Sequence, residues 1–196
     1  QSVIVSGRFS PSKRESGFYP FELLDFIAGS GGFRSRIFQQ IRTDEGLAYS
    51  TGSFYRARPD YGLFGTYVLT KAESTVRALA VLNSILGDLS TQPVRVEELS
   101  SAKKAIDNSF IFSFASAERI VSQYVSVEYD GLPGDYLKSY RKRIEAVTEK
   151  DLLDAAARYL GATSPSVTLI LGNASVLEEL RKIHPSMEVL APLPEE

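Results

Sequence analysis

The sequence contains no cysteine and no tryptophan, and its only histidine is His184. Without cysteine the chain can form neither disulfides nor thiolate metal sites. A lone histidine without a second histidine or a carboxylate pair nearby favours a surface residue over a metal ligand. No Gly-x-Ser-x-Gly motif is present either. We therefore expect no metal site in this chain and no self-contained hydrolase chemistry.

Long hydrophobic runs and an excess of one charge are also missing. The longest mostly apolar runs, such as residues 78–82 and 167–171, fall far short of the ~20 residues that a transmembrane helix needs. The 22 basic and 24 acidic residues are dispersed and give a net charge of -2, which provides no footprint for nucleic acid or an anionic membrane. The length favours a single domain over residues 1–196. The first residue is Gln1, not methionine, and we expect further residues upstream.

Residues rich in β-branched and aromatic side chains predict four strands, at 3–9, 48–58, 62–71 and 166–171. Pro59-Asp60-Tyr61 supplies the turn residues that join the second and third strands as a hairpin. Since none of these strands can fold alone, we expect one mainly antiparallel sheet.

Apolar residues at helical spacing predict the remaining structure. Three of the expected helices span 35–43, 136–144 and 175–183, one begins at Pro20, and one extends from Pro93 past Phe114. Two more follow capping boxes, at Thr70-x-x-Glu73 and at Thr148-x-x-Asp151. Strands and helices in this order predict a two-layer α+β fold, with the helices packed on one face of the sheet.

Arg42 and Tyr49 are the first candidates for a functional site. Arg42 closes the short helix, Tyr49 opens the next strand, and the turn Glu45-Gly46-Leu47 could bring both side chains to one edge. An arginine and a phenol can hold a peptide carbonyl and stabilise the oxyanion that forms when water attacks it. Two structural explanations compete, because arginine in a last helical turn complements the helix dipole and tyrosine in a strand usually packs.

The glycines at 29, 31 and 32 are the second candidate. They follow a helix and lack the Gly-Lys-Ser/Thr ending of a phosphate-binding loop, so they indicate the end of a helix.

The run from Gly31 to Ser50 resembles a motif of the pitrilysin/insulinase family of zinc metallopeptidases. The matching residues are Gly31-Gly32, Ser35-Arg36-Ile37-Phe38, Arg42 and Gly46-Leu47-Ala48-Tyr49-Ser50, and weaker similarities occur at Glu97-Glu98-Leu99 with Lys103, at Gly131-Leu132-Pro133 and at Val147-Thr148. In the family this run belongs to the half that does not bind zinc, and the zinc motif H-x-x-E-H cannot be written with one histidine.

The resemblance implies a C-terminal, metal-free half that is inactive alone and pairs with an N-terminal half carrying zinc and the general base. Arg42 and Tyr49 would then orient the scissile carbonyl of a peptide substrate, and Gly29, Gly31 and Gly32 could form a loop that contacts substrate. It also suggests that the aromatic residues of the hairpin line a chamber that binds extended peptide.

Two alternatives stay open at this point. The chain could be an inactive scaffold or partner-binding subunit of the same fold, or a binding module of unrelated origin. Composition leaves the compartment undecided, although short bacterial members of the family are often exported, which favours the periplasm.

Overall fold

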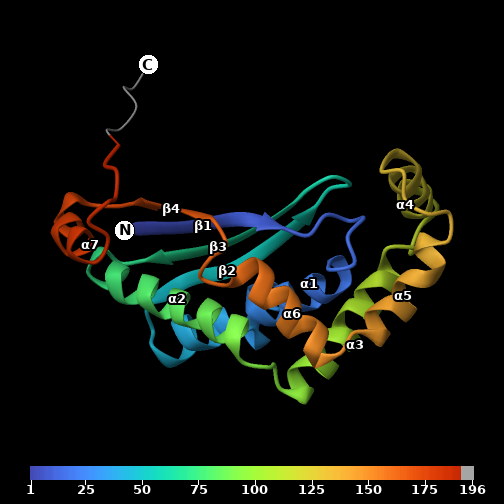
Figure 1. Ribbon diagram of the computed structural model, residues 1–196, viewed down its shortest axis with the longest axis horizontal. Coiled ribbons are helices and arrows are strands. Elements are labelled where there is room, and N and C mark those ends of the chain that lie inside the picture. The colour runs from blue at the N-terminus through green and yellow to red at the C-terminus, as the bar shows by residue number, and fades with distance from the viewer. Residues whose placement is uncertain (191–196) are drawn as a thin grey trace.

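The computed structural model describes residues 1–190 and shows one antiparallel sheet of four strands with helices gathered on one side (Figure 1). The strands are β1 (Ser2–Ser10), β2 (Ala48–Ala57), β3 (Gly62–Thr70) and β4 (Ser166–Leu171). Their order is β2-β3-β1-β4. The α+β prediction is therefore confirmed, while six residues of the expected domain range 1–196 lie outside the described part.

Strand β1 holds the sheet together because it pairs with β3 on one side and β4 on the other. Its side chains alternate between the two faces, as the period of a strand requires. Ile4 is fully buried on the helix side, whereas its neighbour Val5 is 36% exposed on the other side. The core consequently lies between the sheet and the helices.

The helices form two groups. The α-helices are α1 (Phe18–Asp25), α2 (Thr75–Thr91), α3 (Val96–Phe112), α4 (Ala117–Tyr129), α5 (Tyr136–Ala146), α6 (Glu149–Leu160) and α7 (Leu177–Ile183). Helices α1, α2 and α6 pack against the strands, and α3 and α5 pack against α1. Helix α4 packs on α5 at the far end of the molecule from α7 (Figure 1).

Between α1 and β2 the chain uses short turns of unusual geometry. These are the π-helical segment η1 (Phe26–Ser30), the 3-10 turn η2 (Gly32–Arg34) and the π-helical segment η3 (Phe38–Asp44). The helix expected at 35–43 is thus mostly a π-helix. In this segment Ile37 and Ile41 are fully buried, while Phe38 is only half-buried.

Two local predictions were wrong. The capping box at Thr70 does not form, because Thr70 is the last residue of β3 and its hydroxyl donates to the Leu47 carbonyl at 2.5 Å. A 3-10 turn (Ala72–Ser74) then leads into α2. The helix after Pro93 ends at Phe112, before the serine-containing break that separates it from α4.

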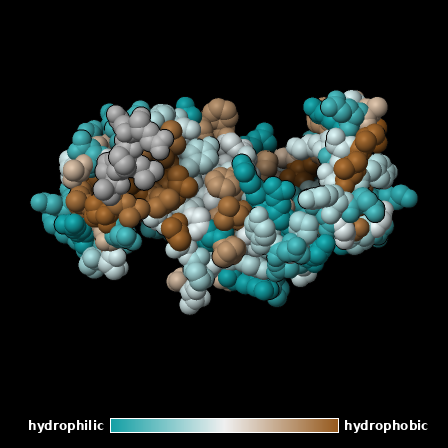
Figure 2. Space-filling model, turned by 90° about the horizontal axis from the view of Figure 1, so that it is seen from above, coloured by the Kyte–Doolittle hydropathy of each residue, from teal (hydrophilic) through white to brown (hydrophobic). Residues whose placement is uncertain are grey.

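The second face of the sheet has no helix over it within the described residues. Large apolar side chains are exposed there on β1 and β4, with Phe9 at 73%, Val167 at 66%, Leu169 at 59% and Leu171 at 76%. Strand register places them on one side, since Val5 lies opposite Leu169 and Gly7 opposite Val167. We call these four residues the open-face patch. Figure 2, which views the molecule from above, shows apolar atoms gathered toward its α7 end.

Of the two capping boxes predicted from the sequence, one forms in the structure and the other does not, so substitutions in the two can be compared. In the box that forms, Thr148 Oγ1 accepts from the Asp151 N–H at 3.2 Å. We expect Thr148→Ala to lower the free energy of unfolding by about 1 kcal/mol and Glu73→Ala to change it by less than about 0.5 kcal/mol. Urea unfolding measures both, and equal losses would contradict the assignment.

Candidate functional site

Arg42 and Tyr49 come from adjoining elements joined by a tight turn. Gly46 adopts φ +62°, a left-handed conformation that favours glycine. The Leu47 N–H then donates to the Ile41 carbonyl at 2.9 Å, which ties the end of η3 to the start of β2. This turn positions Arg42 in the last turn of η3 and Tyr49 as the second residue of β2.

Tyr49 lies in a β-bulge, which the sequence did not predict. Ala48 pairs with Thr70 and Ser50 with the preceding residue of β3, so Tyr49 is the extra residue between them. A bulge redirects the side chain of its extra residue and is frequent next to active sites. The Tyr49 side chain is 50% exposed, and its hydroxyl makes no hydrogen bond to any described residue.

Arg42 is exposed and lies over an aromatic ring. Its guanidinium carbon is 4.8 Å from the centroid of Phe38, and the Phe38 ring packs edge-on against Phe33 with centroids 4.7 Å apart. Stacking on an arene restrains the guanidinium while leaving its N–H donors in the plane of the group available. Within residues 1–190 no ion pair or hydrogen bond occupies them.

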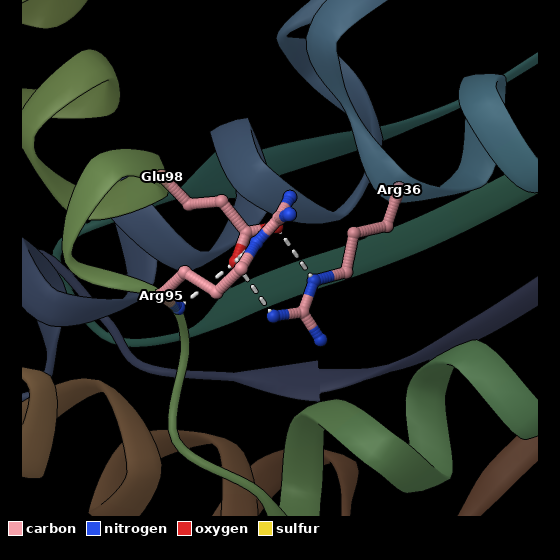
Figure 3. Close-up of polar contacts among 3 residues, drawn as sticks. All are labelled: Arg36, Arg95 and Glu98. Carbon is pink, nitrogen blue, oxygen red and sulfur yellow. Dashed lines mark hydrogen bonds and ion pairs between the residues drawn. The ribbon is translucent and has the colours of Figure 1, made fainter.

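A partly buried ion pair anchors the segment that carries Arg42. Arg36 donates to both carboxylate oxygens of Glu98 on α3, at 2.9 and 2.8 Å, and the Arg95 N–H donates to the same carboxylate at 2.9 Å (Figure 3). The side chains of Arg36 and Glu98 are 17% and 11% exposed. Burial would raise the pKa of Glu98, but hydrogen bonds from Arg36 and Arg95 outweigh it and lower that pKa to about 2.

The three glycines differ in their surroundings. Gly29 is buried, and a Cβ there would lie 2.4 Å from the backbone nitrogen of Ser53 on β2, so glycine permits this close packing. A Cβ on Gly31 would lie 2.5 Å from the Phe26 carbonyl. Gly32 is exposed with φ +60° and begins η2, while the preceding helical segment ends at Ser30 with Gly31 as its C-cap.

The described part of the chain offers no arrangement for a metal. No group of three or more His, Asp or Glu side chains in residues 1–190 could hold an ion. His184 is exposed just after α7. The residues present therefore do not fit the zinc of a metallopeptidase. Among the described helices, none is long and apolar enough to cross a membrane.

Comparison with known proteins places this geometry in a family. Residues 1–106, which include η1 to η3 and all of the Arg42 and Tyr49 site, match the family model described as the peptidase M16 inactive domain. The chain belongs to this family. The M16 inactive domain is the metal-free half of zinc-protease-like proteins, which confirms the family resemblance inferred from the motif between Gly31 and Ser50.

Curated relatives carry both peptidase and non-peptidase names. An uncharacterised zinc protease of Streptomyces coelicolor is 26% identical over 170 residues, covering 87% of this chain and 37% of the relative. A protein of Helicobacter pylori described as a non-peptidase homolog is 25% identical over 133 residues, covering 68% of this chain and 31% of that protein. The chain spans between 25% and 38% of the length of the curated relatives it matches.

Solved structures share the fold. The M16 inactive domain from Pseudomonas fluorescens superposes with a TM-score of 0.79 at 22% identity, over 86% of this chain and 40% of that one. At this identity the similarity establishes the architecture, a sheet with helices on one face, and leaves the roles of individual residues to the geometry above.

The Arg36–Glu98 pair predicts a pH-dependent contribution to stability. The pKa of Glu98 falls from 4.5 to about 2 on folding, so its contribution is present above pH 4.5 and is lost as the pH falls toward 2. We expect Glu98→Gln to lower the free energy of unfolding by about 3 kcal/mol at neutral pH, and by less than half of that at about pH 3.

Urea unfolding at the two pH values measures this difference. Asp154→Asn is the control, because Asp154 pairs with Lys150 at 2.6 Å on the exposed face of α6 and such pairs contribute less than ~1 kcal/mol. The interpretation fails if both variants lose the same stability.

Proposed function

We propose that this chain is the substrate-binding, metal-free half of a zinc metalloendopeptidase, and that Arg42 and Tyr49 orient the scissile carbonyl. The observation that carries the proposal is the pair of exposed donors on adjoining elements. Arg42 is held over Phe38, Tyr49 is redirected by a bulge, and neither donates to a described residue. Two unused donors at one edge suit a carbonyl that gains negative charge.

The remaining chemistry would come from another half. Zinc bound there would activate a water molecule and polarise the carbonyl, with a carboxylate of that half as general base. This chain would contribute a guanidinium fork and a phenol to the developing oxyanion, without exchanging protons itself. Both groups lie within residues 1–106, the part matched by the family model.

Strand β2 supports a role in holding an extended peptide. It is an edge strand, a position at which strand addition occurs, and Tyr49 lies at its beginning. Of the three glycines, Gly31 and Gly32 are accessible for contact with substrate, whereas Gly29 is buried against Ser53. The hairpin aromatics divide between the two faces: Phe64 is buried on the helix side, whereas Tyr67 pairs with Val5 on the other side and is half-buried.

The open-face patch supports pairing with the zinc-bearing half. Contiguous exposed apolar side chains on a sheet face mark a protein interface, because their contact with water is unfavourable. The patch is formed by β1 and β4, which lie in the middle and at one edge of the sheet. We propose that the missing half covers this face.

Substitution of Tyr49 tests the catalytic contribution. In the complex of this chain with its zinc-bearing half, we expect Tyr49→Phe to lower kcat by about 10² to 10³, since it removes one donor to the oxyanion. The measurement is steady-state hydrolysis of a peptide. The control is Tyr61→Phe on the hairpin, which removes an equally exposed phenol from another place. Unchanged turnover in Tyr49→Phe would remove Tyr49 from the mechanism.

A charge within the open-face patch tests the interface. We expect Leu169→Asp to weaken assembly with the zinc-bearing half at least tenfold, because an unpaired carboxylate would have to lose water at the interface. Val96→Asp is the control, since Val96 is 63% exposed on α3, on the helix side of the molecule. Sedimentation of the mixed halves measures assembly, and equal affinity of the two variants would place the interface elsewhere.

A second function is a scaffold of the same fold that takes no part in hydrolysis. The relative described as a non-peptidase homolog favours it. An activity measurement on this chain assembled with the zinc-bearing half distinguishes the two functions. If the assembled halves hold zinc, hydrolyse no peptide and still bind tightly, the scaffold function replaces the catalytic one.

A further inference from the structure

A cavity of about 420 Å³ lies at the opposite end of β2 from Tyr49. The end of β2 and helices α1, α3, α4 and α5 contribute to its lining. The eight residue-to-residue steps from Tyr49 to Ala57 span about 26 Å at the rise of a strand, so the cavity is separate from the Arg42 and Tyr49 site. Figure 2 shows the molecule hollowed between the sheet and the α4 end, with apolar atoms in the hollow.

Aromatic residues form one part of the cavity wall, and the basic residues Lys13, Arg56 and Arg58 also line it. Phe18, Tyr55, Phe110, Tyr136 and Tyr140 line it. The rings of Phe110 and Tyr140 are stacked, with centroids 4.6 Å apart and planes inclined by 13°. A cavity of this size with several aromatic walls can enclose a flat or elongated side chain.

A half-buried carboxylate lies among these rings. Glu22 projects from α1, and its Oε2 accepts from the Tyr140 hydroxyl at 2.7 Å. No described residue donates to Oε1, and the side chain remains partly exposed to the cavity. Burial raises the pKa of Glu22 to about 7. A half-buried carboxylate, with one oxygen that accepts no hydrogen bond from a described residue, therefore lines an open pocket large enough for a ligand.

The groups around Glu22 leave that oxygen available. The titratable groups near it are Lys13 before α1, Tyr19 and Asp25 on α1, Tyr55 on β2, and Tyr136 and Tyr140 on α5. Lys13 is already paired with Asp130 at 2.5 Å, and Asp25 accepts from Ser53 at 2.5 Å. Burial raises the pKa values of the tyrosines, which stay neutral around pH 7.

Arg56 and Arg58 line the pocket and are exposed to solvent. Their charges are in contact with water, where salt screens them strongly, whereas Glu22 acts at short range inside the cavity. An anion entering the cavity would meet the Glu22 carboxylate. A cation would find an acceptor oxygen and aromatic faces, both of which attract ammonium and guanidinium groups.

We propose that this cavity binds the cationic end of a lysine or arginine side chain, with Oε1 of Glu22 as its hydrogen-bond acceptor and the rings of Phe110 and Tyr140 as its apolar wall. Binding would stabilise the ionised carboxylate and release the proton that Glu22 holds near neutral pH. The site uses none of the residues proposed to orient the scissile carbonyl, so it does not depend on their role.

A purely structural role for Glu22 is a weaker explanation. The Tyr140 bond does connect α1 to α5, but a neutral acceptor could make it without burying a charge. Another tyrosine–glutamate pair in the chain shows the contrast. Glu15 accepts from the Tyr159 hydroxyl at 2.8 Å and also from the Ser12 N–H at 2.8 Å, and its pKa is lowered mainly by that backbone bond. Glu22 lacks such a second donor.

Calorimetric titration of the chain with N-acetyl-arginine amide and N-acetyl-lysine amide tests the proposal. We expect affinity to fall roughly thirty-fold from pH 8 to pH 5.5, because the ionised fraction of a carboxyl with a pKa of about 7 falls by that factor. Proton release should accompany binding near pH 7, and the heat should then depend on the ionisation enthalpy of the buffer.

Two variants distinguish the contribution of the Glu22 carboxylate to binding from its contribution to the stability of the fold. Glu22→Gln keeps an acceptor for Tyr140 and should lose at least tenfold in affinity at pH 8, together with the pH dependence. Glu15→Gln removes a carboxylate from the matched pair outside the cavity and should bind like the wild type. Equal binding by Glu22→Gln and wild type would overturn the proposal.

Neutral analogues keep the test valid even if Glu22→Gln does not fold. N-acetyl-citrulline amide matches arginine in shape without its charge, and we expect no binding. Equal binding of the citrulline and arginine amides to the wild-type chain would overturn the proposal. Arginine within a five-residue peptide and a simple diamine distinguish the source of the cation: tighter binding of the peptide assigns the site to polypeptide, and equal binding assigns it to free amines.

Discussion

The central position of β1 is the constraint on which the rest of the structure depends. It pairs with β3 and β4 at once, so the beginning, middle and end of the chain meet in one sheet. The alternation along β1 then separates two environments: Ile4 faces the helices and is fully buried, and Phe9 faces the other side and is 73% exposed. A sheet with helices on one face only has a second surface, and the apolar residues of the open-face patch are exposed on it.

The same arrangement explains how the candidate site is held. η1 approaches β2 so closely that only glycine fits at position 29, and the Arg36–Glu98 pair ties the next segment to α3. Arg42 therefore extends from a segment fixed at both sides, and the bulge at Tyr49 lies directly beyond the turn. Exposed side chains on a fixed backbone lose less conformational freedom on meeting a substrate than the same side chains on a mobile loop.

Most strands and helices could be predicted from the sequence because their apolar periodicity coincides with burial in the final structure. The exceptions share a physical cause. Thr70 has the sequence pattern of a helix cap. In the structure it pairs with Ser2 of β1 and its hydroxyl donates to the Leu47 carbonyl, so it ends β3 and caps no helix. The bulge at Tyr49 depends on the register between β2 and β3, which local sequence does not encode. Glu22 could have been noticed, since it interrupts the apolar positions of α1.

The free donors at Arg42 and Tyr49 bear on the choice between peptidase and scaffold. A structural arginine usually satisfies its guanidinium with carboxylates or carbonyls, as Arg36 does with Glu98. Arg42 instead has only the Phe38 ring within the described residues. On the proposed function, these unpaired donors beside a redirected phenol are the groups that would receive the negative charge of a substrate carbonyl.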